Sequence, residues 1–142
     1  MTRWLLATNL AAALFLTGLI WTVQIVHYPL FARVGAAGFA AYEAEHSARI
    51  TVIVGPVMLL ELAAAAALVF LRPAGVPAWA AWASLTLVGL IWASTALLQI
   101  PRHAELAAGF DAAAHAALVA TNWIRTAAWT ARSALLLWLS FR

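Results

Sequence analysis

The chain has 142 residues, of which 66% are hydrophobic and only 9% are charged, and its formal net charge is +3. Soluble domains are roughly 45–50% apolar and about 25% charged, so this composition excludes an ordinary soluble domain and predicts an integral membrane protein. Lysine and cysteine are absent, and the arginines stand singly among apolar runs. Disulfides and thiolate metal sites are therefore excluded, and no basic stripe is present to bind nucleic acid.

We expect a single all-α domain over residues 1–142, an integral membrane four-helix bundle. A bilayer core needs about 20 apolar residues per helix, and proline- and arginine-bearing breaks separate four such stretches. The first and third stretches end at Pro29 and Pro101, where helices commonly stop. Four spans place both termini on one side of the membrane. The predicted spans cover residues 4–28, 50–71, 77–100 and 115–139.

The segment between the first two spans is too polar to cross a membrane. Phe39, Tyr42 and His46 recur there at helical spacing, which predicts a short interfacial helix from Phe39 to His46 that turns into, or continues as, the second span. Membrane lipid is the expected partner. We expect the protein in a membrane such as the bacterial inner membrane, with both termini in the cytoplasm, although the arginines divide evenly between the two faces.

All four histidines fall at the same predicted membrane face, at the ends of the spans: His27, His46, His103 and His115. Imidazoles in helix bundles can ligate haem or a metal ion, and Glu43 with His46 forms one Glu-x-x-His pair. A di-iron bundle needs two such pairs. The favoured interpretation is therefore interfacial placement or hydrogen bonding to a substrate. No cofactor is predicted, and haem or a metal held among Glu43 and the histidines is the alternative.

Glu61 lies near the middle of the second span, where a charged side chain is costly and indicates a functional site. Arg125 lies near the middle of the fourth span. Because a charge at that depth needs a partner, the sequence predicts a buried Glu61–Arg125 pair. A packing role alone is the alternative interpretation of these polar residues.

Each predicted span also carries one polar stripe, and each stripe is richest toward the histidine face. Helices with one polar face turn those faces inward, so we expect a polar pocket that is open at the histidine side. It would bind a hydrophobic small molecule. The expected lining residues are Gln24, His27, His46, Thr95, Gln99, His103, Asn122 and Arg125.

Two segments of the C-terminal half carry a family resemblance. One is Thr95-x5-Pro101-x-His103-x2-Leu106, and the other is Thr121-Asn122-Trp123-Ile124-Arg125-Thr126. They resemble a family of small four-span membrane proteins that includes anthrone oxygenases, in which a Thr precedes Pro-x-Asn-x2-Leu and an Asn-x2-Arg-Thr follows in the fourth helix. This chain has His103 where the family usually has Asn.

The resemblance implies a membrane enzyme that oxidises a planar phenolic, anthrone-like ring to a quinone with molecular oxygen and without a flavin. It implies His103 or His27 as the base and Arg125 and Asn122 as donors to the oxyanion. Stacking walls would come from Trp92, Trp123 or Trp129. Two other classes stay open: a haem- or quinone-binding subunit, and a non-catalytic accessory subunit of a membrane complex. A homo-oligomer or a larger membrane complex is the expected kind of assembly.

Overall fold

The computed structural model describes the backbone of residues 2–141 and the side chains of residues 4–141, so Met1 and Arg142 of the predicted domain lie outside the described residues. All regular elements in this part of the chain are helices, as predicted. They are α1 (Thr2–Thr22), the π-helical segment η1 (Val23–His27), α2 (Tyr28–Phe31), α3 (Ala36–Phe70), α4 (Ala78–Ser94), the π-helical segment η2 (Thr95–Gln99), α5 (Ile100–Ala107) and α6 (Ala112–Ser140).

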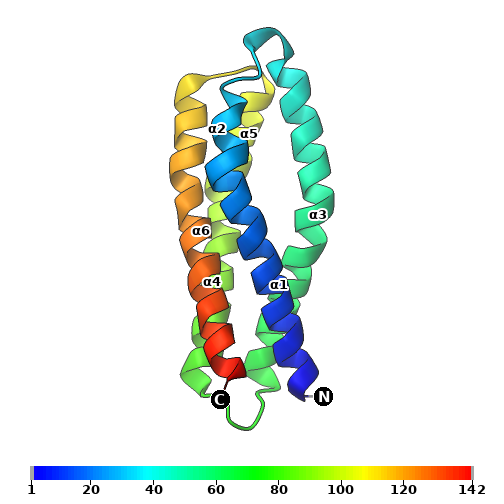
Figure 1. Ribbon diagram of the computed structural model, residues 1–142, viewed down its shortest axis with the longest axis vertical. Coiled ribbons are helices and arrows are strands. Elements are labelled where there is room, and N and C mark those ends of the chain that lie inside the picture. The colour runs from blue at the N-terminus through cyan, green and yellow to red at the C-terminus, as the bar shows by residue number, and fades with distance from the viewer. Residues whose placement is uncertain (1, 142) are drawn as a thin grey trace.

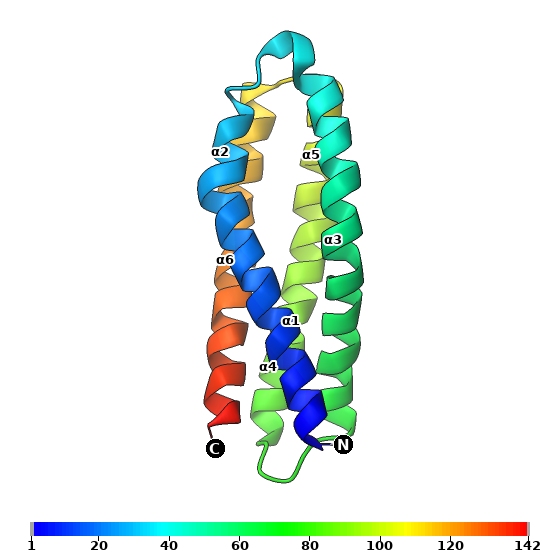
Figure 2. The same cartoon turned by 45° about the vertical axis from the view of Figure 1, so that its right-hand side comes forward.

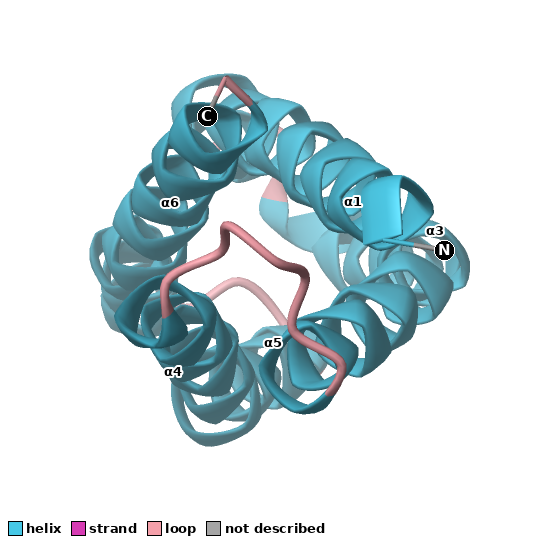
Figure 3. Ribbon diagram, turned by 90° about the horizontal axis from the view of Figure 1, so that it is seen from below, coloured by secondary structure: helices cyan, strands magenta, loops and turns pink. Residues whose placement is uncertain are grey.

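These elements form four long rods, because α1, η1 and α2 follow one another without a break, as do α4, η2 and α5. Each rod packs against two neighbours: α1 against α3 and α6, and α4 against the same two helices. Figure 3 shows the rods at the corners of a ring when the bundle is seen along its axis. Both ends of the chain lie at the same end of the bundle (Figures 1 and 2).

The helices do not stop at Pro29 and Pro101, contrary to the prediction. Each proline follows a π-helical segment, in which the Tyr28 N–H bonds to the Val23 carbonyl and the Ile100 N–H to the Thr95 carbonyl. A proline normally breaks a helix because it lacks an N–H and its ring crowds the preceding turn. The wider turn before each proline accommodates the ring, so the first rod continues to Phe31 and the third continues to Ala107.

Of the two arrangements predicted for residues 39–46, an interfacial helix that turns into the second span and one that continues as it, the structure shows the continuous helix. Residues 39–46 are helical, but they belong to α3, which runs without interruption over 35 residues. The chain reverses before α3 at Gly35, whose φ of 86° is a conformation that favours glycine. Because no turn or helix breaker interrupts the sequence between His46 and Ile50, the helix that contains the second predicted span begins at Ala36 rather than at Ile50.

Three helical stretches of the described chain are long and apolar enough to cross a membrane: Trp4–Phe31, Ala36–Phe70 and Ala78–Ala107. The helix α6 has 29 residues but is not among them. It contains Arg125 and Arg132, both of which are buried inside the bundle. Asp111 caps its N-terminus by accepting a hydrogen bond from the Ala114 N–H at 2.7 Å.

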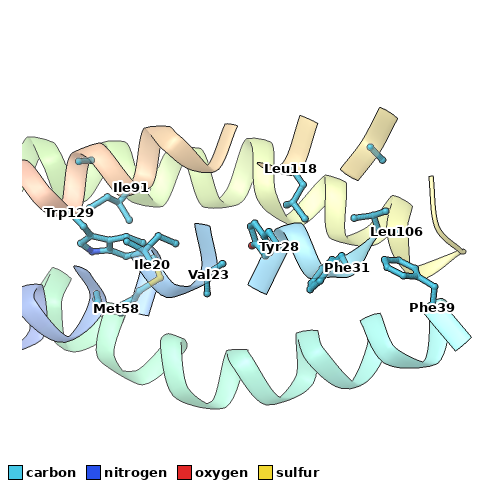
Figure 4. Packing of buried hydrophobic residues seen from close by; sticks show 13 residues of the cluster. Ile20, Val23, Tyr28, Phe31, Phe39, Met58, Ile91, Leu106, Leu118 and Trp129 are labelled. Carbon is cyan, nitrogen blue, oxygen red and sulfur yellow. The ribbon is translucent and has the colours of Figure 1, made fainter. Parts of the chain in front are cut away.

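The larger apolar cluster extends along the bundle axis (Figure 4). At the histidine end, the aromatic rings of Phe31 and Phe39 pack in edge contact, with ring centroids 6.0 Å apart, and Leu106 is fully buried beside them. At the other end, Met58 and Trp129 close the cluster from α3 and α6. Tyr28 lies between the two ends.

Candidate functional site

A cavity of about 460 Å³ lies inside the bundle and reaches all four rods. Ligand pockets in proteins commonly have about 300–1,000 Å³ and an apolar lining with a few polar groups. This cavity fits that description. Its polar and aromatic lining residues are Tyr28, His46, Ser47, Thr51, Trp92, Thr95, Gln99, His103, Arg125 and Trp129.

A chain of hydrogen bonds joins Glu43, His103 and Tyr28, of which His103 and Tyr28 line the cavity. Glu43, which is fully buried, accepts a hydrogen bond at Oε1 from His103 Nδ1 at 2.6 Å. In the arrangement with Glu43 as a carboxylate, which can only accept, and His103 as a neutral imidazole, Nδ1 carries the proton and Nε2 is the acceptor. The Tyr28 hydroxyl lies 2.9 Å from that Nε2 and donates to it. The arrangement is a carboxylate–imidazole–phenol relay that begins beneath the histidine face and ends in the cavity.

Arg125 is buried, with 7% of its surface exposed, and it lines the same cavity. Its acceptors are all neutral: Asn122 Oδ1 at 2.9 Å from Nε, Thr95 Oγ1 at 3.4 Å, the Tyr28 hydroxyl at 3.4 Å and Gln99 Oε1 at 3.5 Å. Within residues 4–141 no carboxylate forms an ion pair with Arg125. A buried guanidinium without a counter-ion favours binding of negative charge in the adjacent space.

Asn122 lies behind Arg125 and outside the cavity. Its amide nitrogen donates to Gln24 Oε1 at 2.7 Å, while its oxygen accepts from Arg125. Gln24 donates in turn to the Val119 carbonyl at 3.2 Å. Both amides are therefore occupied by one another and by Arg125, and they orient the guanidinium rather than contact a ligand.

The predicted Glu61–Arg125 pair is wrong. Glu61 Oε1 accepts from Arg132 Nη1 at 2.8 Å, and both side chains are fully buried. Arg132 also donates to Asn9 Oδ1 at 2.6 Å. The two arginines lie on the same stripe of α6, and Arg132 does not reach out to the terminus-side surface because Asn9 and Glu61 hold it within the bundle.

Trp129 connects this ion pair with the cavity. Its indole N–H donates to Glu61 Oε2 at 3.0 Å, and its ring lies against the guanidinium of Arg125, with 5.9 Å between Cζ and the ring centroid. The contact is a cation–π interaction, which contributes more when it is shielded from water. The ion pair thus fixes the wall against which Arg125 rests.

A second, outer groove lies between η1 and α3, and His46 and Ile50 line both this groove and the inner cavity. His27 lines only the outer groove, where its Nε2 is 2.9 Å from His46 Nδ1. Among the predicted bases, only His103 therefore lines the cavity. His115 is held by the Tyr28 carbonyl at 2.7 Å and lines neither space.

The predicted ligand residues divide into two groups. His46, Trp92, Thr95, Gln99, His103, Arg125 and Trp129 line the cavity, whereas Gln24, His27, Asn122 and Trp123 do not. Trp123 is 44% exposed on the outside of α6 and packs edge-on against Trp21, with ring centroids 5.6 Å apart. It belongs to the outer surface of the bundle.

Tyr28 and the role of Glu43 in the relay were not predicted. On a regular helix the side chains three and four residues after Gln24, His27 and Tyr28, both lie near the same face. The π-helical turn of η1 adds about one residue to the turn, which brings Tyr28 inward and is consistent with His27 facing the outer groove. After the segment η2, His103 lines the cavity and Arg102 pairs with Glu105 at the surface. In the sequence, the only sign of each π-helical segment is a proline two residues after its end.

Among residues 4–141 no three His, Asp or Glu side chains are placed to hold a metal ion together. The candidate ligands instead form hydrogen bonds with one another, with Tyr28 or with Ser47; these candidates are Glu43, His27, His46, His103 and His115.

The chain matches no family model, no curated protein and no solved structure.

Proposed function

We propose that the protein crosses the membrane four times, with α6 as the fourth span. The support is that the arginine side chains of α6 point into the bundle and its large apolar side chains point outward. Arg125 and Arg132, which lower its apolar character, are buried, whereas Trp123, Ile124 and Leu137 are exposed on its outer face. An apolar outer face with the charges inside is the arrangement that a bilayer requires.

We further propose that the cavity is the active site of an oxygenase-like enzyme that oxidises a planar phenolic or anthrone-like ring to a quinone. The observation that carries this proposal is Arg125, a buried cation with neutral partners only, 3.4 Å from a tyrosine hydroxyl that bonds to His103. The site combines a base with a group that stabilises an anion. These are the two functions that oxidation of such a ring by oxygen demands from a protein.

The reaction would start with removal of a proton from the reactive carbon of the anthrone. The Tyr28 oxygen takes this proton while its own proton moves to His103 Nε2, and Glu43 stabilises the imidazolium. Arg125 binds the oxygen of the resulting enolate, on which the negative charge develops. Molecular oxygen adds to the carbon, and the His103 imidazolium returns its proton through Tyr28 to the peroxide anion. The hydroperoxide then loses water as the second C–H bond and the O–O bond break. Anthrone and O₂ thus give the quinone and water.

The aromatic walls serve the same chemistry. Trp92 and Trp129 line the cavity from α4 and α6, and flat rings bind well against indoles because both surfaces are apolar and rigid. In this proposal Trp129 supports the substrate ring and the guanidinium of Arg125 at the same time.

The test is oxygen uptake and quinone formation by detergent-purified protein supplied with anthrone, with the spontaneous rate in the same detergent subtracted. We expect wild type to turn over and His103→Gln to lose about a hundredfold or more of the rate. The matched control is His27→Gln, which removes an imidazole at the same end of the bundle but outside the cavity and is expected to retain activity. No turnover by wild type, or equal losses in the two variants, would contradict the proposal.

A further inference from the structure

The cavity is elongated along the bundle axis. On the first rod its lining extends from Leu16 to Tyr28, and on α3 it extends from His46 to Met58. Each run covers twelve residue steps, which is about 18 Å at ~1.5 Å per residue. The cavity is therefore longer than three fused six-membered rings, the planar unit that the proposed reaction needs.

The polar groups of the cavity are concentrated toward the histidine face. Tyr28, His46, Gln99 and His103 lie there, and Arg125 with Thr95 lies below them. Deeper along the axis, the walls contributed by the first rod and α3 are hydrocarbon. These deep residues are Leu16, Leu19, Ile20, Val54 and Met58.

Gly55 widens this apolar part of the cavity. It lies on α3 in the lining, and a methyl group added there would come no closer than 3.9 Å to any neighbour, the Thr51 Cγ2 atom. An apolar space of this kind does not hold water well. Hydrocarbon is the occupant whose surface matches these walls.

From this division we infer that the substrate is an amphiphile: a phenol or quinol ring that carries a hydrocarbon tail. The inference rests on the proposed function for the ring, whose oxygen lies at Arg125 in the histidine half. The tail extends from the ring into the deep half, between the first rod and α3. Such molecules dissolve in the bilayer that surrounds the protein, so no aqueous route to the site is required.

The inference is tested by binding of two naphthoquinones, menadione and its decyl-substituted homologue, to detergent-purified protein. Quinones quench tryptophan fluorescence, and partition of each compound into protein-free micelles is measured and subtracted. The decisive variant is Val54→Phe, which fills part of the deep half. Its control is Val52→Phe, the same substitution two residues away on the same helix, where the side chain is 74% exposed on the outside.

We expect Val54→Phe to weaken binding of the decyl compound by about tenfold or more, because several methylene groups lose their space. Binding of menadione should change less than twofold, and Val52→Phe should affect neither compound. Equal effects on both compounds, or no effect on either, would overturn the inference. If Val54→Phe does not fold, a series of tail lengths measured on wild type replaces it, and an affinity that does not rise with tail length is the contrary result.

The outcome separates this inference from the proposed reaction. Tail-dependent binding that is sensitive to Val54→Phe, combined with no turnover of the corresponding quinol, would retain the ligand class and reject the oxidation. Turnover of anthrone without any dependence on a tail would retain the oxidation and reject the ligand class.

Discussion

Glu61 and Arg132 form an ion pair with 2.8 Å between Oε1 and Nη1, and neither side chain is exposed. Loss of one partner leaves an uncompensated buried charge, which costs about 3–5 kcal/mol. Glu61→Gln and Arg132→Met should therefore each lower the free energy of unfolding by about that amount, and the double variant should recover part of the loss. Thermal or denaturant unfolding in detergent measures this.

Arg125 supplies the matched control for this pair. Arg125 has no ion-pair partner among the described residues and is linked to Glu61 only through Trp129, so Arg125→Met combined with Glu61→Gln should show a much smaller coupling energy than Arg132→Met combined with Glu61→Gln. Additive behaviour of the Glu61–Arg132 pair would contradict the observed pairing.

Tyr28→Phe tests the relay without removing the ring. The hydroxyl contacts His103 and Arg125, but the aromatic body packs in the apolar cluster. We expect the rate of anthrone oxidation to fall by about a hundredfold, while the binding of anthraquinone changes little and the free energy of unfolding falls by no more than about 1–3 kcal/mol, the cost of losing a buried hydrogen bond. Activity near that of wild type would exclude Tyr28 from proton transfer.

Trp129 and Trp123 lie on the same helix and differ in what they contact. Trp129→Phe removes the N–H that bonds to Glu61, so a loss of about 1–3 kcal/mol in the free energy of unfolding is expected, together with weaker binding of anthraquinone. Trp123→Phe should change the free energy of unfolding by about 0.5 kcal/mol or less, because its side chain is 44% exposed. Similar effects of the two substitutions would contradict a stabilising role for the hydrogen bond between Trp129 and Glu61.

Composition and periodicity predicted the helical class and the gathering of polar side chains, because both follow from where apolar residues recur. They did not predict which of two adjacent residues faces inward. For the first rod that choice depends on the π-helical turn before Pro29, which favours Tyr28 over His27, whereas His103 was already expected to line the cavity. A prediction from hydrophobic spacing assumes a regular α-helix. One π-helical turn therefore changes which of the later residues faces inward, and the spacing does not reveal it.

The wrong partner predicted for Glu61 has a similar cause, because two arginines lie on one face of α6. Arg125 and Arg132 are both on the inner side of α6, and the sequence does not state the relative depth of Glu61 on α3. The extension of α3 to 35 residues, together with the contact to Asn9 on α1, sets that depth. Tertiary packing thus decides which arginine is paired and which retains an uncompensated charge.

The central claim is that Arg125 holds negative charge on a ring oxygen in the cavity. It is tested most directly by the visible spectrum of a bound hydroxyanthraquinone, whose phenolate absorbs at longer wavelength than its neutral phenol. At a pH where the free dye is neutral, wild type should bind it with the phenolate band, and Arg125→Gln should bind it with the neutral spectrum. A neutral spectrum in wild type, or a phenolate band that persists in Arg125→Gln, would contradict the claim.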